Sequence, residues 1–153
     1  MATSVDTNVI GYLLLDADGD RADAAEAALR GALGAGRIVV CGPVFAELLA
    51  TEAWDAPTLL SALATMRFDV HLPLDAGVWP VAAQAYAGYL RSRRPADYVC
   101  PRCLVRGQEL SRPKHILSDF LIGADADHHG HALLTDDAGL YEAFFPRVPL
   151  RRL

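Results

Sequence analysis

The sequence predicts an α/β fold built around a central, mainly parallel β-sheet. Short β-branched or apolar runs of strand length alternate with longer stretches of helical periodicity along the whole chain. Turn-forming residues such as Gly36 and Gly42-Pro43 stand between several of these stretches. Strands that alternate with helices pair in parallel, because each helix returns the chain to the same end of the sheet.

The first half of the chain begins with a very short apolar run that ends at Val5, and a helix follows. A second, alanine-rich helix carries Ala24 and Ala28 at helical spacing and is closed by glycines. The β-branched run Arg-Ile-Val-Val-Cys predicts a strand, and the Gly-Pro after it fits the start of a helix. Asp55 and Pro57 open a further helix. The expected helices are 8–15, 20–33, 44–51 and 55–66, and the expected strands end at 5 or span 37–41 and 68–72.

The second half continues the alternation with a long alanine-rich helix, a more apolar helix and a short final helix. The expected helices are 75–94, 115–127 and 138–144, and the expected strands are 132–135 and 148–150. The stretch 95–114 has weak periodicity and is long for a connection inside a compact domain. We therefore expect a single domain over 1–153 with an insertion at 95–114.

Composition limits the class of protein. The 153 residues suffice for one ordinary domain, and 52% hydrophobic residues provide a sizeable core. The net charge of −5 excludes a uniformly basic nucleic-acid-binding surface but not a local basic patch. No stretch reaches the roughly 20 apolar residues of a membrane helix, and the N-terminus lacks a basic signal region. Because three cysteines also form a poor disulfide framework, we expect a cytoplasmic protein without membrane association.

Acidic residues stand at strand ends or inside apolar helices. Asp6 follows the first strand, Glu47 lies in the helix after the second, and Asp119 lies at the start of an apolar helix. Asp136 and Asp137 adjoin the strand that ends near Thr135. Sites collect where the carboxyl ends of parallel strands share one edge. Converging carboxylates repel one another, so we expect Mg²⁺ or Mn²⁺ among them, a site suited to phosphodiester hydrolysis.

Each acid also has a purely structural interpretation. Asp6 could form an Asx-turn, and Glu47 could be favoured by the helix dipole. Asp119 could be a helix N-terminal residue that faces water, and either aspartate of the doublet could cap the next helix. Against this, Gly123 and Ala126 share the helix face of Asp119 and are expected to leave room beside its carboxylate. The four acidic positions together favour a site.

The acidic residues lie in four short motifs, which are Val5-Asp6-Thr7-Asn8, Val44-Phe-Ala-Glu47-Leu-Leu, Ser118-Asp119-Phe-Leu-Ile-Gly-Ala and Leu134-Thr135-Asp136-Asp137. In this order, the four motifs resemble those of a PIN domain, and specifically a VapC-like toxin ribonuclease. The eighteen-residue spacing of Asp119 and Asp137 also matches the family. The resemblance covers nearly the whole chain.

The resemblance implies a three-layer α/β/α fold and a Mg²⁺- or Mn²⁺-dependent endoribonuclease that cleaves RNA with a metal-activated water. It further implies a homodimer that is held inactive by a VapB-like antitoxin. Asn8 and Thr135 would support the ligand carboxylates, and Asp136 would be an outer acid or a helix cap. Carried over residue by residue, the metal-binding and catalytic acids are Asp6, Glu47, Asp119 and Asp137.

The chain departs from the family pattern at three places. Asp136 stands where many relatives carry arginine, Asp125 stands where another residue such as histidine or alanine is common, and the stretch 95–114 is extra. An inactive PIN-like interaction module is therefore an alternative. Receiver-like or haloacid-dehalogenase-like chemistry is disfavoured, because the only lysine, Lys114, lies outside any expected strand and no second acid follows Asp6 at the required spacing.

The extra stretch contains Cys100-Pro-Arg-Cys103, which has the spacing of a zinc knuckle. A structural Zn²⁺ needs four ligands and no second Cys-x-x-Cys exists, so zinc on Cys100 and Cys103 competes with an unliganded or redox-sensitive thiol pair. The His-His-Gly-His stretch 128–131 is most simply a solvated turn, with a ligand role as the lesser alternative.

The stretch 91–114 is basic although the chain as a whole is acidic. It holds six arginines and one lysine against one aspartate and one glutamate. These residues form either a solvated face or a patch that binds RNA phosphates beside the acidic site. The RNA-binding candidates are Arg91, Arg93, Arg94, Arg112 and Lys114.

Overall fold

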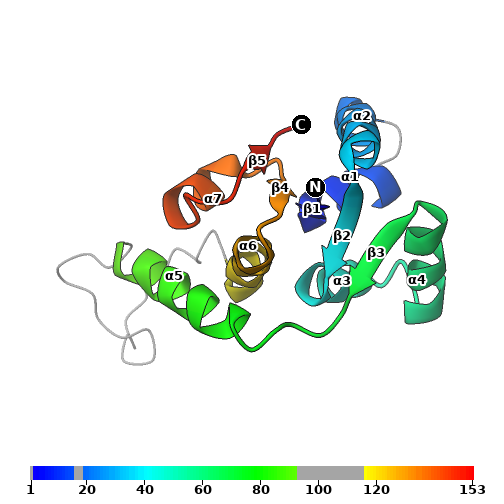
Figure 1. Ribbon diagram of the computed structural model, residues 1–153. Helices are drawn as coiled ribbons and strands as arrows, with labels where there is room; N and C mark the ends of the chain where they lie inside the picture. Colours follow the sequence, from blue (N-terminus) through cyan, green and yellow to red (C-terminus); the bar gives the residue numbers. More distant parts are fainter. Residues whose placement is uncertain (1, 16–18, 93–115) are drawn as a thin grey trace, which may run out of the picture.

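The centre of the computed structural model is a parallel β-sheet, and the structure describes residues 2–15, 19–92 and 116–153 (Figure 1). The strands are β1 (Ala2–Val5), β2 (Arg37–Cys41), β3 (Phe68–His71), β4 (Ala132–Leu134) and β5 (Leu150–Arg151). They lie in the order β3-β2-β1-β4-β5, and each neighbouring pair is parallel. The expected α/β class is confirmed, with a sheet that is parallel rather than mainly parallel.

Helices cover both faces of this sheet, which produces the three layers that the resemblance implies. The described helices are α1 (Thr7–Leu15), α2 (Asp20–Ala35), α3 (Gly42–Leu49), α4 (Ala56–Thr65), α5 (Val78–Ser92), α6 (Leu117–His129) and α7 (Ala138–Phe144). In Figure 1, α5, α6 and α7 lie on one side of the sheet and α1 and α2 on the other. Among these helices none is both long and apolar enough to cross a membrane.

Most element bounds agree with the sequence patterns to within a few residues, and β2 and α7 coincide with the expected spans. Asp55 caps α4 as expected, because its Oδ1 accepts the backbone N–H of Thr58 at 2.8 Å. The start of α5 is later than expected, since the Val78 N–H bonds the Asp75 carbonyl in a turn before the helix. The last strand is also shifted, from the expected 148–150 to Leu150–Arg151. The extra stretch 95–114, with Cys100 and Cys103, lies outside the described residues.

The core that holds α6 against its neighbours is aromatic. Phe120 is fully buried, and its ring contacts Tyr86 and Tyr89 of α5 with centroids 5.1 and 5.3 Å apart. Phe144 and Phe145, at the end of α7, lie 5.6 and 6.3 Å from the same ring. Burying a phenylalanine side chain stabilises a fold by about 1.5–3 kcal/mol. This cluster therefore fixes the first turn of α6, where one of the expected site acids lies.

Candidate metal centre

Asp6 is the most buried of the expected site acids and lies between β1 and α1, with 5% of its surface exposed. Its Oδ1 accepts the Thr7 backbone N–H at 2.8 Å. Its Oδ2 accepts the Asn8 side-chain amide at 3.0 Å and the Thr135 hydroxyl at 2.6 Å. The parallel pairing of β1 with β4 brings Thr135 to this carboxyl. Asn8 and Thr135 thus contact the acid that they were expected to support.

The electrostatic environment of Asp6 disfavours its charge. Burial, with a smaller contribution from the nearby Asp119 carboxylate, raises the pKa of this carboxyl to about 6, although the hydrogen bonds from Thr135 and Thr7 act in the opposite direction. The Tyr141 hydroxyl is also buried near Asp6 and lowers the pKa of Asp6 slightly, although the contact lacks the geometry of a hydrogen bond. A buried carboxylate in this setting is stabilised by a proton or by a cation.

Glu47 is held by two hydroxyl groups from other helices. Thr7 at the start of α1 donates a hydrogen bond to Oε2, and Ser118 at the start of α6 donates one to Oε1. The helix α3 that carries Glu47 contacts both of these helices. The side chain is therefore oriented between the Asp6 end of β1 and the Asp119 end of α6.

Asp119 lies in the first turn of α6 and is half-buried. Its Oδ2 accepts the Ile116 backbone N–H at 2.7 Å, so the carboxylate also stabilises the helix start. The negative charge of Asp119 also raises the pKa of Asp6. The expectation that Gly123 leaves room beside this carboxylate was wrong. A Cβ at Gly123 would lie 2.5 Å from the Phe145 ring, so the space is filled by that ring.

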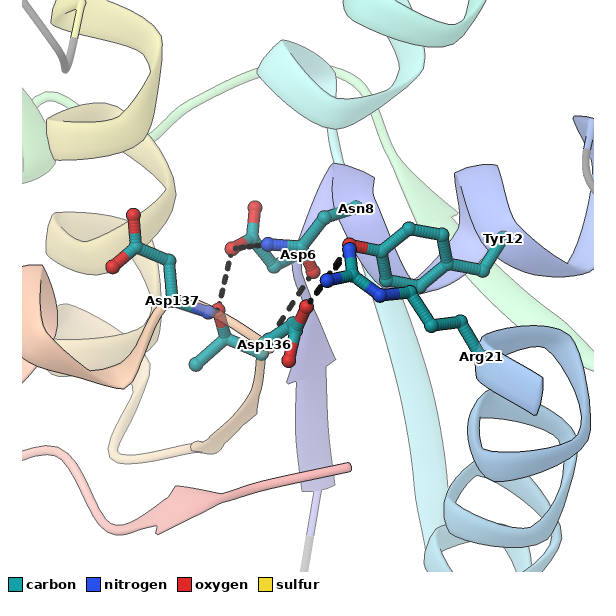
Figure 2. Close-up of polar contacts among 7 residues, drawn as sticks. Asp6, Asn8, Tyr12, Arg21, Asp136 and Asp137 are labelled. Carbon is teal, nitrogen blue, oxygen red and sulfur yellow. Dashed lines mark hydrogen bonds and ion pairs between the residues drawn. The ribbon is translucent and has the colours of Figure 1, made fainter. Parts of the chain in front are cut away.

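The two adjacent aspartates after β4 point in different directions (Figure 2). The Asp137 side chain lies on the same side of the chain as the Asp6 carboxyl. The Asp137 backbone N–H donates a hydrogen bond to the Thr135 hydroxyl, which itself donates one to Asp6. Asp137 occupies the N-cap position of α7, but its side chain makes no capping hydrogen bond. The Asp136 side chain points away from Asp6, toward α1 and α2.

Asp136 takes part in a separate polar cluster at the rim of the site. Its Oδ2 accepts the Tyr12 hydroxyl at 2.9 Å and lies 3.6 Å from Arg21 Nη1. The Arg21 guanidinium also donates to the Tyr12 oxygen at 2.6 Å and lies over its ring, 5.1 Å from the centroid. The backbone N–H of Asp136, in contrast to its side chain, faces the acidic site and donates a 3.3 Å hydrogen bond to Asn8 Oδ1. The charge of Asp136 is thus balanced by Arg21.

The donor set fits a hard divalent cation. Carboxylate oxygens are the ligands that Mg²⁺ and Mn²⁺ prefer, and the carboxylates of Asp6 and Asp119 are close enough for each other's charge to matter. Three hydrogen bonds occupy three of the about four acceptor positions of the Asp6 carboxylate and leave one on Oδ1. Asp6 could therefore bind a cation through one oxygen only.

Sequence reasoning missed several groups that shape this site. Thr7 and Ser118 lie beside Asp6 and Asp119 in the quoted motifs, yet only the fold shows that both hydroxyls bind Glu47. Tyr12 and Arg21 carried no recognisable signal, because each is far in sequence from its partner Asp136.

The basic candidates are only partly visible. Arg91 is exposed in the last turn of α5. The remaining members of the expected set, Arg93, Arg94, Arg112 and Lys114, lie outside the described residues. The expected solvated turn at 128–131 was wrong in part. His131 is buried, and its Nδ1 lies 3.0 Å from Ser4 Oγ.

Fold and site together define an α/β protein with a carboxylate centre at the carboxyl edge of a parallel sheet. The sequence matches the PIN domain family model over residues 4–145. The chain belongs to the PIN-domain family, and membership of this family implies a nuclease. The expected resemblance is thereby confirmed. A comparison with curated proteins found no match.

Solved structures share the fold along almost the whole chain. VapBC2 from Rickettsia felis, bound to a DNA fragment from its promoter, matches with a TM-score of 0.62 at 14% identity over 100% of this chain and 99% of that chain. VapBC-1 from nontypeable Haemophilus influenzae matches with 0.63 at 16% identity, covering 99% and 98%. FitAcB from Neisseria gonorrhoeae matches with 0.54 at 20% identity, covering 97% and 95%. At these identities the likeness shows the fold.

Proposed function

We propose that this chain is a Mg²⁺- or Mn²⁺-dependent endoribonuclease and the toxin of a toxin–antitoxin pair. The observation that carries the proposal is the convergence of Asp6, Glu47 and Asp119 at one edge of the sheet, with Asp137 joined to Asp6 through Thr135. Membership of the PIN-domain family supports a nuclease. The likeness to chains of VapBC complexes supports a VapB-like antitoxin as partner.

The four acids would hold the cation, and the surrounding groups would orient them. When bound, Mg²⁺ or Mn²⁺ supplies activation of water and stabilisation of the leaving oxygen in phosphodiester hydrolysis. Thr135, Asn8 and Thr7 fix the Asp6 carboxyl and leave one acceptor position on Oδ1 for the cation. The hydroxyls of Thr7 and Ser118 fix Glu47 in the same way. One of these carboxylates, with an oxygen that does not bind the cation, would accept the proton of the attacking water.

The remaining parts of the proposal concern the partners. RNA phosphates would be bound by the basic stretch that begins at Arg91, which is exposed next to the aromatic core of α5 and α6. We place the active toxin in the cytoplasm as a homodimer, in line with the family resemblance. The structural role of the extra cysteines, including a zinc on Cys100 and Cys103, stays a proposal that metal analysis of the purified protein would test.

The test of the proposed function is RNA cleavage by the Asp119→Asn variant. Total RNA is incubated with the purified chain and Mg²⁺, with and without EDTA. We expect cleavage by the wild type in Mg²⁺ only, and a loss on the order of 100-fold or more in the variant. Asparagine can still accept the Ile116 N–H that caps α6, so the fold should be retained.

A matched control is Asp23→Asn, which makes the same chemical change in the first turn of α2, at an exposed position. This variant should cleave like the wild type. Cleavage that persists in EDTA, or that is equal in the Asp119 variant and the control, would remove the acidic site from the mechanism. A wild-type chain that never cleaves RNA in Mg²⁺ or Mn²⁺ would favour the alternative of an inactive PIN-like interaction module.

A further inference from the structure

We propose a second metal site, for a zinc-class ion, formed by Asp75, His128 and His129. The carboxylate and the two imidazoles each offer one ligand atom, and these atoms lie within 4.8 Å of one another. Asp75 Oδ2 is 3.2 Å from His129 Nε2 and 3.6 Å from His128 Nε2. The three residues are outside the acidic centre and independent of the proposed nuclease function.

The separations match the edges of a tetrahedron around zinc. Zinc binds nitrogen and oxygen ligands at about 2.0–2.2 Å, which places two tetrahedral ligand atoms about 3.3–3.6 Å apart. Of the two separations from Asp75 Oδ2, the 3.6 Å to His128 Nε2 lies at the upper end of this range and the 3.2 Å to His129 Nε2 lies just below it. The two imidazole nitrogens lie within 4.8 Å of each other, so an ion between the three side chains would need them only to move closer together. Imidazole ligands select zinc and its neighbours in the transition series rather than Mg²⁺.

The hydrogen bonds of His129 prepare its Nε2 as a ligand atom. Its Nδ1 lies 2.9 Å from the backbone carbonyl of Asp125 and 3.4 Å from the Asp125 carboxylate, so Nδ1 carries the hydrogen. In the neutral ring the lone pair is then on Nε2 and faces the Asp75 carboxylate. Two lone pairs that face each other need a proton or a cation between them. A second imidazole, that of His128, points at the same oxygen, which favours a shared cation.

The fold holds the three ligands together from two separate segments. His128 and His129 end α6, while Asp75 lies in the connection between β3 and α5. That connection passes directly against the His128 ring, because a Cβ on Gly77 would lie 2.6 Å from His128 Cε1. Ten residues of α6, about 15 Å along the helix axis, separate this site from Asp119. A bound ion would fasten the β3–α5 connection to the end of α6.

Zinc titration followed by native mass spectrometry tests the proposal. It uses a Cys100→Ser, Cys103→Ser background, so that the two thiols cannot bind the probe, and excess Mg²⁺, which fills the oxygen-ligand site. We expect one zinc per chain. His129→Ala in this background should weaken binding by more than about 100-fold, because the loss of a mere supporting partner already costs about 10–100-fold.

His71→Ala is the matched control, since it removes an exposed histidine that is not one of the three ligands. It should bind zinc like the background. Equal zinc binding by the His129 variant, or no stoichiometric zinc in the background, overturns the proposal. If the cysteine background does not fold, histidine carbethoxylation of the unmodified chain replaces it. Zinc should then protect His128 and His129 but not His71, and full reactivity of both at saturating zinc would overturn the site.

Discussion

At the scale of single residues, Asp6 is the acid of the expected site whose negative charge is most disfavoured by burial. Burial raises its pKa from 3.8 to about 6, so the folded chain binds more protons than the unfolded chain between these pH values. The contribution of Asp6 to the free energy of unfolding of the metal-free protein therefore falls as the pH rises from about 4 to about 6 and levels off above. A shift of about two pKa units corresponds to a loss on the order of 3 kcal/mol.

Asp6→Asn removes this titration and provides the measurement. We expect denaturant unfolding in EDTA to show the variant gaining stability relative to the wild type, by up to about 3 kcal/mol, between pH 4 and pH 7. The change with pH is the quantity to compare, because the substitution also alters the hydrogen bonds from Thr135 and Asn8. Asp23→Asn, at an exposed position, should show no such trend. A stability difference that is constant across this range would contradict the prediction.

The aspartate doublet shows what a sequence can and cannot predict at this scale. The order and spacing of the motifs predict Asp137 as a site acid and Asp136 as a departure from the family pattern, and the two side chains point in different directions in Figure 2. The ion-pair partner of Asp136 was not predictable from the sequence. It depends on α2 bringing Arg21 to α1, where Arg21 contacts Tyr12, and no local pattern encodes that approach.

At the scale of elements, α6 contributes residues both to the acidic centre and to the proposed zinc site. Its first turn holds Asp119, its middle packs Phe120 and Gly123 against aromatic rings, and its last turn holds the two histidines of the proposed zinc site. Helical period was enough to predict a helix over 115–127, but the observed helix continues to His129 and ends before Gly130, which is left-handed with φ 64°. The tertiary contact of Gly123 was not predictable, because Phe145 is brought there by α7.

Gly123→Ala tests the close contact between α6 and α7. In a helix, alanine is normally more favourable than glycine by about 1 kcal/mol. Here the new Cβ would lie 2.5 Å from the buried Phe145 ring, so the ring must shift and the overpacked core should lose about 1–3 kcal/mol. The control is Gly31→Ala in α2, where a Cβ meets no atom within 4 Å and should stabilise the fold. Stability is measured by thermal or denaturant unfolding. If both variants are stabilised alike, the Phe145 ring can move away from the new Cβ at little energetic cost.

At the scale of the whole molecule, the uneven distribution of charge is the main feature that affects a nucleic-acid partner. The chain carries a net charge of −5, and its acidic centre would repel RNA without a cation. The stretch 91–114 gathers seven of the 14 basic residues. Each phosphate that a protein neutralises on a single strand adds about 0.7 to the slope of log affinity against log salt. The salt dependence of binding therefore counts the cations that contact the backbone.

This count yields a prediction for the proposed ribonuclease. In the Asp119→Asn background, which prevents cleavage during the measurement, Arg93→Gln with Arg94→Gln should reduce the salt slope by about 1.4 and weaken binding most at low salt. The control pair is Arg30→Gln with Arg152→Gln. These arginines are already ion-paired, with Glu26 and Glu142, so their loss should leave the slope nearly unchanged. Both double variants remove two positive charges. If their salt slopes are equal, any loss of affinity comes from the general change in net charge, and RNA is bound by another surface.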